Sequence, residues 1–197
     1  MSADRPSGDR DPGVRRGARR DRRPPPPLDG AALDRLALRY VERFSTTRLR
    51  LATYLARKIR ERGWNGAPAD PAVLAERMAA LGYIDDRAFG EARASAMARR
   101  GLGKRRVAGA LRHDGIGAED AEALAPDIEA RTLDAALTFA RKRRIGPFAD
   151  VAADRAQREK HIAAMIRGGH DFALARRIAS MAPGETVDTV DTVDTVD

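Results

Sequence analysis

The chain has 197 residues, of which 43% are hydrophobic but only 5% aromatic, a balance that favours alanine-rich packed helices over a β-sandwich. The absence of cysteine excludes disulfides and thiolate metal sites. No apolar run approaches the roughly 20 residues that a membrane span needs, and the N-terminus lacks an apolar signal core. We therefore expect a cytoplasmic protein with no membrane partner.

The formal net charge of +8 is unevenly distributed along the chain. Residues 1–27 carry a net +4 and residues 185–197 a net −5, which leaves +9 for residues 28–184. A basic domain predicts an acidic partner surface or a nucleic acid as partner. Arginine far outnumbers lysine, which favours bidentate binding of phosphate or carboxylate, although a biased codon composition would produce the same excess.

Both ends of the chain are predicted to be disordered. Residues 1–27 consist mainly of Arg, Asp, Gly and Pro, and they cannot bury enough apolar surface to offset their conformational entropy. This arm is either a solvated tail or an electrostatic arm that raises encounter rates with a polyanion. Residues 185–197 contain the triplet Thr-Val-Asp four times, and a period of three fits neither helix nor strand.

Between the ends the sequence predicts helices only. The first helix is marked by apolar residues at helical spacing: Leu33, Leu36, Tyr40 and Phe44. A second helix, which Ser45 can cap, turns an apolar stripe inward and leaves its bases in water. The stripe is Leu51, Leu55 and Ile59, and the solvated bases are Arg48, Arg50, Arg57 and Lys58. Asp70 and Pro71 form an N-cap and first-turn pair that opens a third helix through Leu81.

The fourth helix, near 86–100, begins at two adjacent acids, Asp85 and Asp86. Paired carboxylates can serve acid–base or metal chemistry, but neighbours at a helix start do not converge, so we interpret them as N-caps. Tyr83 and Phe89 are predicted to pack in the core rather than to stack on bases. The later helices are predicted at 104–113, 118–125, 127–144, 150–167 and in a last segment that starts at His170 or Asp171.

Breaks at glycine and proline divide the helices in the second half of the chain, and two of them carry the argument. Asp114 and Gly115 close the helix at 104–113. Pro126 is predicted to end the helix at 118–125, because proline lacks the backbone N–H and its ring clashes with the preceding turn.

The order of helices and stops predicts three similar units, at about 33–81, 86–125 and 127–182. The second and third units superimpose at an offset of 54 residues, with these pairs: Leu111 on Met165, Gly115 on Gly169, and Leu124 on Ile178. Each unit is too small to bury an apolar face alone, so stacked units must share a core. We predict an all-α fold, an elongated array of tandem three-helix repeats spanning 28–184.

Five bases surround Gly101 and Gly103 in the stretch between the fourth and fifth helices: Arg99, Arg100, Lys104, Arg105 and Arg106. They form either a solvated turn or a contact surface for phosphate or carboxylate groups. The stretch lacks the strand-to-helix context and glycine spacing of a nucleotide-binding loop.

Two further groups of bases are candidates for partner binding: Arg141, Lys142, Arg143 and Arg144 in one, and Arg176 and Arg177 in the other. The first group ends a predicted helix, where the dipole alone favours cations. The three histidines (His113, His161 and His170) are not spaced for a metal site, and no serine lies in a nucleophile elbow. We therefore predict no catalytic residue, no metal and no cofactor.

Three segments of the sequence together resemble the RecX family of bacterial recombination regulators. They are Gly82-Tyr83-Ile84-Asp85-Asp86-Arg87-Ala88-Phe89, Arg100-Gly101-x-Gly103-Lys104-Arg105-Arg106, and Leu111-x-x-x-Gly115-Ile116. The combination is fairly specific, and looser similarity extends over 33–182. The last unit departs from the pattern, because His170-Asp171-Phe172 stands where an apolar residue usually follows the glycine.

The resemblance implies tandem three-helix repeats, no enzymatic activity, and binding to the RecA filament on single-stranded DNA. It further implies that recombination and coprotease activity are inhibited or tuned, with direct DNA contact possible. We expect a monomer. The alternative interpretation is a basic helical protein that binds nucleic acid without RecA, and the charge of residues 28–184 supports it. The sequence gives least support to an enzyme, because it contains no catalytic constellation.

Overall fold

The computed structural model describes residues 25–186, and nearly all of the predicted arm and tail lies outside that range. Within it the chain is all-α, and the one β-like pairing is an isolated bridge between Leu28 and Trp64. The helices are α1 (Gly30–Val41), α2 (Arg48–Arg62), α3 (Pro71–Ala80), α4 (Asp86–Arg99), α5 (Lys104–His113), α6 (Ala118–Ala130), α7 (Thr132–Arg143), α8 (Arg155–Arg167) and α9 (Phe172–Ser180). Among the described residues, every helix is too short or too polar to span a bilayer.

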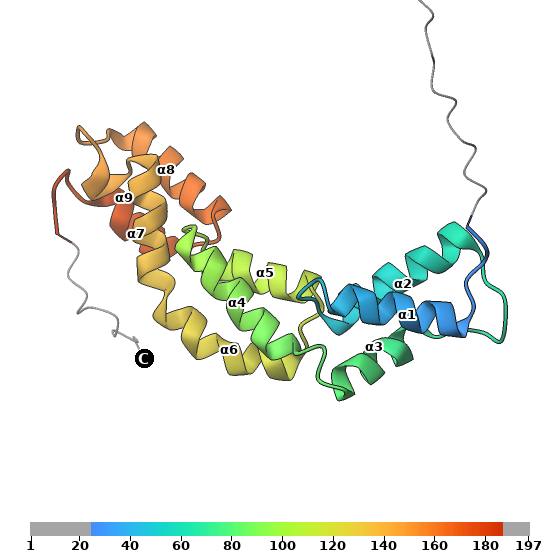
Figure 1. The fold of residues 1–197 in the computed structure, drawn as a ribbon. Helices are drawn as coiled ribbons and strands as arrows, with labels where there is room; N and C mark the ends of the chain where they lie inside the picture. Colours follow the sequence, from blue (N-terminus) through green and yellow to red (C-terminus); the bar gives the residue numbers. More distant parts are fainter. Residues whose placement is uncertain (1–24, 187–197) are drawn as a thin grey trace, which may run out of the picture.

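The nine helices of the described range form an arc of three three-helix units, α1–α3, α4–α6 and α7–α9 (Figure 1). Each unit has its own buried apolar cluster, centred on Leu51 and Leu55 in the first, Leu111 in the second, and Met165 and Ile178 in the third. The second helix of each unit, α2, α5 or α8, lies on the inner side of the arc (Figure 1). The elongated helical array that the sequence predicts is thus confirmed.

Residues that the offset of 54 pairs between the later units share their burial or their backbone conformation. The paired apolar residues are all buried: Leu111 with Met165, and Leu124 with Ile178. Gly115 and Gly169 both end their helices with a positive φ, of 81° and 93°. The same offset places His170 on Ile116, and both side chains are buried. The histidine that departs from the family pattern therefore occupies a core position.

Three N-caps follow the sequence prediction, since the side chains of Asp70, Asp85 and Asp171 each accept a hydrogen bond from a first-turn N–H. The prediction of Ser45 as the cap of α2 is wrong. Thr47 caps this helix, with its hydroxyl accepting from the N–H of Arg50 at 3.2 Å. The chain leaves α1 at Val41 and needs a longer loop before the next helix can begin.

Pro126 does not end a helix, because α6 continues through it to Ala130. Proline removes the hydrogen bond to the carbonyl of Glu122, but both residues are exposed, so water can hydrate that carbonyl. On the other side of the helix Leu124 and Ile128 pack into the second core and hold the helix in place. Tertiary packing has overridden the local preference.

Two later helix boundaries also differ from the prediction. The break falls at Arg131, so the long helix predicted at 127–144 is the shorter α7. A short 3-10 helix, η1 (Gly146–Phe148), follows it, and α8 begins only at Arg155 with Asp154 as its cap.

Tyr83 is not a core residue, contrary to the sequence prediction, since 48% of it is exposed. Its backbone N–H bonds to the carbonyl of Met78 at 3.0 Å and closes the turn after α3, while the ring remains in solvent. Phe89 is half-buried, and the guanidinium of Arg50 lies 5.1 Å from its ring centroid.

Candidate partner-binding surface

A buried ionic joint connects the first unit to the second. The N-terminus of α2 meets two acids of the second unit, Asp86 and Asp114, which are 6% and 0% exposed. Arg48 donates to Asp86 through its backbone N–H at 3.0 Å and its Nε at 2.9 Å. Arg50 donates to Asp114 through Nη2 at 2.6 Å, and the hydroxyl of Thr47 donates to the carbonyl of Asp114 at 2.5 Å.

The charges at this first joint are compensated. The Nε of Arg93 lies 3.3 Å from the second carboxylate oxygen of Asp114. Hydrogen bonds to Asp86, and secondarily to Glu76, raise the pKa of Arg48 above its ordinary value, so this side chain stays charged. A buried carboxylate is tolerated only when it is paired in this way.

The sequence pattern alone does not predict this joint, because it assigns both acids to helix ends and both arginines to a solvated face. Two signals were present. The first turn of α2 contains Arg48 and Arg50 and no acid, where the helix dipole favours the opposite charge. One aspartate also suffices to cap α4, which left Asp86 without a role.

A second joint, between the second and third units, is made of backbone contacts. The N–H of Gly103 donates to the carbonyl of Gly168 at 3.0 Å, and that of Arg105 to the carbonyl of Gly169 at 3.1 Å. A Cβ on Gly103 would lie 2.3 Å from the carbonyl carbon of Gly169, and one on Gly101 would lie 2.9 Å from the backbone nitrogen of Phe139. The two glycines of the basic stretch therefore permit close packing of units.

His170 completes the second joint. It is 0% exposed, and its Nε2 lies 3.1 Å from the carbonyl oxygen of Gly101. Since a carbonyl only accepts, Nε2 carries the proton, and the buried Nδ1 has no hydrogen-bond partner within the described range. Burial lowers the pKa of His170, because the site cannot hydrate the charged imidazolium.

The lowered pKa of His170 predicts that acid weakens the second joint. The unfolded chain takes up a proton on this histidine near its ordinary pKa of about 6.5, and the folded chain does so only at a lower pH, so the free energy of unfolding should fall as the pH drops from 7.5 to 5.5. Urea unfolding at several pH values measures this. The His170→Ile variant should lose most of this dependence, whereas His113→Gln, at an exposed histidine, should retain it. An unchanged slope in His170→Ile would contradict the assignment.

The structure brings two of the three predicted basic groups together. Arg99 and Arg100 end α4, and the first turn of α5 holds Lys104, Arg105 and Arg106. The Nζ of Lys142, in the last turn of α7, donates to the carbonyl of Arg100 at 3.1 Å, so the group at 141–144 adjoins the group at 99–106. Arg176 and Arg177 lie on α9 beside Phe172, in a depression that no other candidate base lines.

Several candidate bases also stabilise the fold. Lys104 pairs with Glu129 at 3.1 Å, and the Nε of Arg106 donates to the carbonyl of Arg167 at 3.1 Å across the second joint. Arg144 pairs with Asp150 at 2.9 Å. Of the five bases at 99–106, three are exposed and make no bond across the second joint: Arg99, Arg100 and Arg105.

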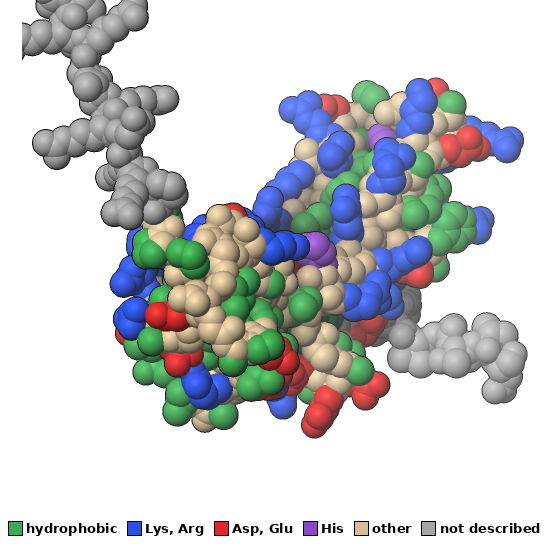
Figure 2. Space-filling view, turned by 90° about the vertical axis from the view of Figure 1, so that its right-hand side faces the viewer, with side chains coloured by type: hydrophobic (Ala, Val, Ile, Leu, Met, Phe, Trp, Pro, Cys, Tyr) green, Lys and Arg blue, Asp and Glu red, His purple; other side chains and the backbone are tan. Residues whose placement is uncertain are grey.

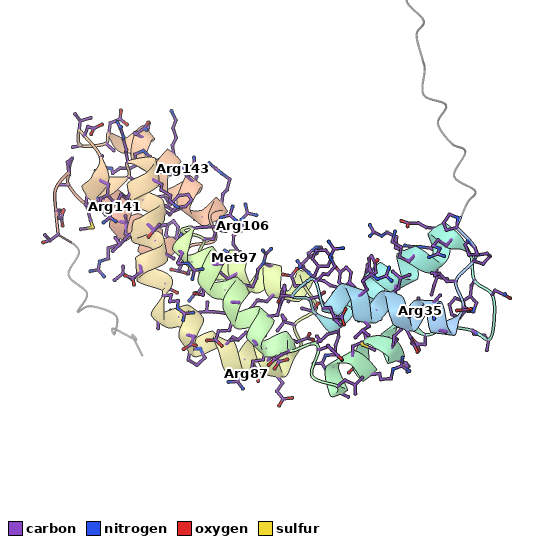
Figure 3. The ribbon with its side chains drawn as sticks, in the orientation of Figure 1. Arg35, Arg87, Met97, Arg106, Arg141 and Arg143 are labelled. Atoms are coloured by element: carbon purple, nitrogen blue, oxygen red, sulfur yellow. The ribbon has the colours of Figure 1, made fainter. Side chains whose placement is uncertain are left out.

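The inner side of the arc is basic over the later units. Viewed from the end of the first unit, Lys and Arg side chains gather over the surface of the later units that faces the viewer (Figure 2). Arg106 and Arg143 lie on this side of the ribbon, while Arg141 lies on the opposite side of α7 (Figure 3). The guanidinium of Arg141 lies 4.7 Å from the ring centroid of Phe148, and that of Arg143 lies 5.5 Å from the ring centroid of Phe139. The bases at 141–144 therefore do not form a single face.

These features define a helical repeat protein with a basic inner face and closely packed joints. In the described range no three His, Cys, Asp or Glu side chains are grouped to hold a metal. The chain is 31% identical over 156 residues to "Regulatory protein RecX" of Agrobacterium fabrum, covering 77% of this chain and 84% of the relative. It is 29% identical over 177 residues to the protein of the same name from Myxococcus xanthus, covering 85% and 92%. The chain belongs to the RecX family.

A solved structure shows the same fold. The crystal structure of RecX from Lactobacillus salivarius matches with a TM-score of 0.57 at 18% identity, over 75% of this chain and 92% of that one. No protein-family model matches the chain.

Proposed function

We propose that this protein regulates the RecA recombinase by binding the RecA filament on single-stranded DNA, as a monomer in the cytoplasm and without catalysing a reaction. Membership of the RecX family is the observation that carries the proposal. The arc of three units and its basic inner face support it, because stacked repeats present extended surfaces to large partners.

Binding would use many weak contacts along the arc. The inner face meets acidic side chains of the filament or phosphates of its DNA, and Arg99, Arg100 and Arg105 provide exposed guanidinium groups for both. Contacts made simultaneously by several units add to the overall affinity without any one of them being strong. Such binding is sensitive to salt.

The proposed consequence is inhibition. A protein that lies along the filament hinders a second DNA, or a repressor that RecA helps to cleave, from reaching the same surface. One bound at a filament end blocks its growth. Strand exchange and coprotease activity both decrease as a result.

The triple variant Arg99→Gln, Arg100→Gln, Arg105→Gln tests the basic turn. Each exposed contact is worth about 0.5–1 kcal/mol, so the loss of three together should weaken filament binding by about ten- to a hundredfold. Co-sedimentation with RecA filaments on single-stranded DNA measures this, and a strand-exchange assay measures the loss of inhibition. Arg106 is left in place because it bonds across the second joint.

The matched control removes the same charge elsewhere, with Arg35, Arg39 and Arg87 changed to Gln, all of them exposed. This control should bind nearly as wild type. Equal losses in both variants would show that only net charge matters, and no loss in either would reduce the turn to a structural connection.

A second candidate function is nucleic-acid binding without RecA, which the charge of +9 over residues 28–184 favours. Electrophoretic shifts titrated against salt separate the two. Equal affinity for DNA with and without RecA, with a slope that reflects several released counterions, would favour this candidate over the RecA interaction.

A further inference from the structure

A cluster of three aromatic rings lies where α1 ends and α2 passes it. Tyr40 stacks on Tyr54 with ring centroids 4.2 Å apart and planes at 26°. Phe44 adjoins Tyr40 at 5.1 Å in a tilted arrangement. The whole chain has only nine Phe, Tyr and Trp residues, so a third of them gather here.

The outermost ring of this aromatic cluster faces solvent. Phe44 is 52% exposed, while Tyr40 and Tyr54 are half-buried against the first core. The backbone N–H of Phe44 donates to the carbonyl of Tyr40 at 3.0 Å, which holds the loop in place. A single exposed apolar residue needs no explanation, but this one extends a stacked aromatic surface outward.

Cations border the same rings. The guanidinium carbons of Arg43 and Arg57 lie 5.7 Å from the ring centroids of Phe44 and Tyr54, and the Nζ of Lys58 lies 5.8 Å from that of Tyr54. Residues 28–63 hold nine bases and four acids, a net charge of +5. Aromatic faces and cations therefore share one surface.

We propose that this aromatic–cationic cluster binds single-stranded nucleic acid, with a base stacked on Phe44 and the neighbouring phosphates held by Arg43 and by Arg57, where a phosphate replaces the exposed ion pair with Glu61. Single strands expose the base faces that a duplex hides, and stacking on aromatic rings beside cations is how proteins hold them without reading sequence. An acidic peptide satisfies the cations but makes no use of the ring. The site is separate from the basic turn at 99–106 and does not depend on RecA.

The test uses the full chain without RecA and two fluorescein-labelled probes, (dT)15 and an abasic strand with the same number of phosphates. The wild type should prefer (dT)15 by about tenfold, since stacking contributes for each base. Phe44→Ala should abolish the preference, and so should Phe44→Leu, which keeps apolar volume but removes the ring. Tyr83→Ala, at an aromatic residue that is 48% exposed on another loop, should retain it.

The contribution of the cations is measured separately, through the salt dependence of binding. Changing Arg43 and Arg57 to Gln should weaken both probes and lower the slope of log affinity against log salt by about 1.4, whereas Phe44→Ala should leave the slope unchanged. Equal binding of (dT)15 and the abasic strand by the wild type would overturn the proposal. So would a preference that survives in both Phe44 variants, or a poly-glutamate peptide that binds as tightly as (dT)15. Because RecA is absent, none of these results bears on the filament interaction.

Discussion

Replacing Gly103 by alanine should lower the free energy of unfolding by about 2–3 kcal/mol, the cost of overpacking a site that cannot yield easily. The new Cβ would lie 2.3 Å from the backbone of Gly169 and 2.5 Å from the nitrogen of His170. Both neighbours are main chain, so no side chain can rotate away. The second joint must open, with loss of the hydrogen bond from Gly103 to Gly168.

Gly109 provides the control for this variant within the same helix, α5. A Cβ there meets nothing within 4 Å, so Gly109→Ala should stabilise the protein by about 0.5–1 kcal/mol through the higher helix propensity of alanine. Urea unfolding of both variants measures the contrast. If Gly103→Ala proved as stable as Gly109→Ala, the close contact between the second and third units would not exist in solution.

Replacing Asp114 by asparagine should cost about 2–3 kcal/mol of unfolding free energy. The carboxylate is fully buried and binds Arg50 and Arg93, and removing one partner of a buried ion pair costs about 3–5 kcal/mol. The arginine side chains are 40% and 43% exposed, so water recovers part of that cost. Asparagine keeps the volume, so the loss reports on charge rather than on a cavity.

Asp150 offers the matched control, since its side chain is 77% exposed and it pairs with Arg144, which is 75% exposed. Asp150→Asn should change stability by less than about 0.5 kcal/mol. Hydrogen exchange locates the effect: amides at the start of α2 should exchange faster in Asp114→Asn, while those of α7–α9 should not change. Uniform acceleration along the chain would contradict a local joint.

The two joints do the same task with different chemistry. Thr47 and Gly103 both precede the second helix of their unit, and each bonds to the turn that follows the second helix of the next unit. The first joint adds buried ion pairs, and the second adds direct backbone packing and His170. Both hold successive units in register, which places the exposed bases of the inner face at set positions along the arc.

Several residues of the basic stretch at 99–106 have structural roles. Its glycines are explained by contact with α7 and with the turn between α8 and α9. Lys104 and Arg106 contribute bonds to Glu129 and to the carbonyl of Arg167. The part of the stretch that is open to a partner is therefore smaller than the count of its bases.

Local patterns in the sequence are enough to predict the all-α class, the order of the helices, the caps at Asp70, Asp85 and Asp171, and the correspondence between Gly115 and Gly169. These features depend on interactions within a few residues, or on a periodicity that is visible in one dimension.

The roles of Asp86 and Asp114 follow from tertiary contacts alone, since their partners lie 38 and 64 residues away in the chain. Tertiary contacts also explain why α6 continues through Pro126 and why Gly101 and Gly103 lie between two units. In each case the free energy comes from burial against another element, and no local preference encodes which element that is.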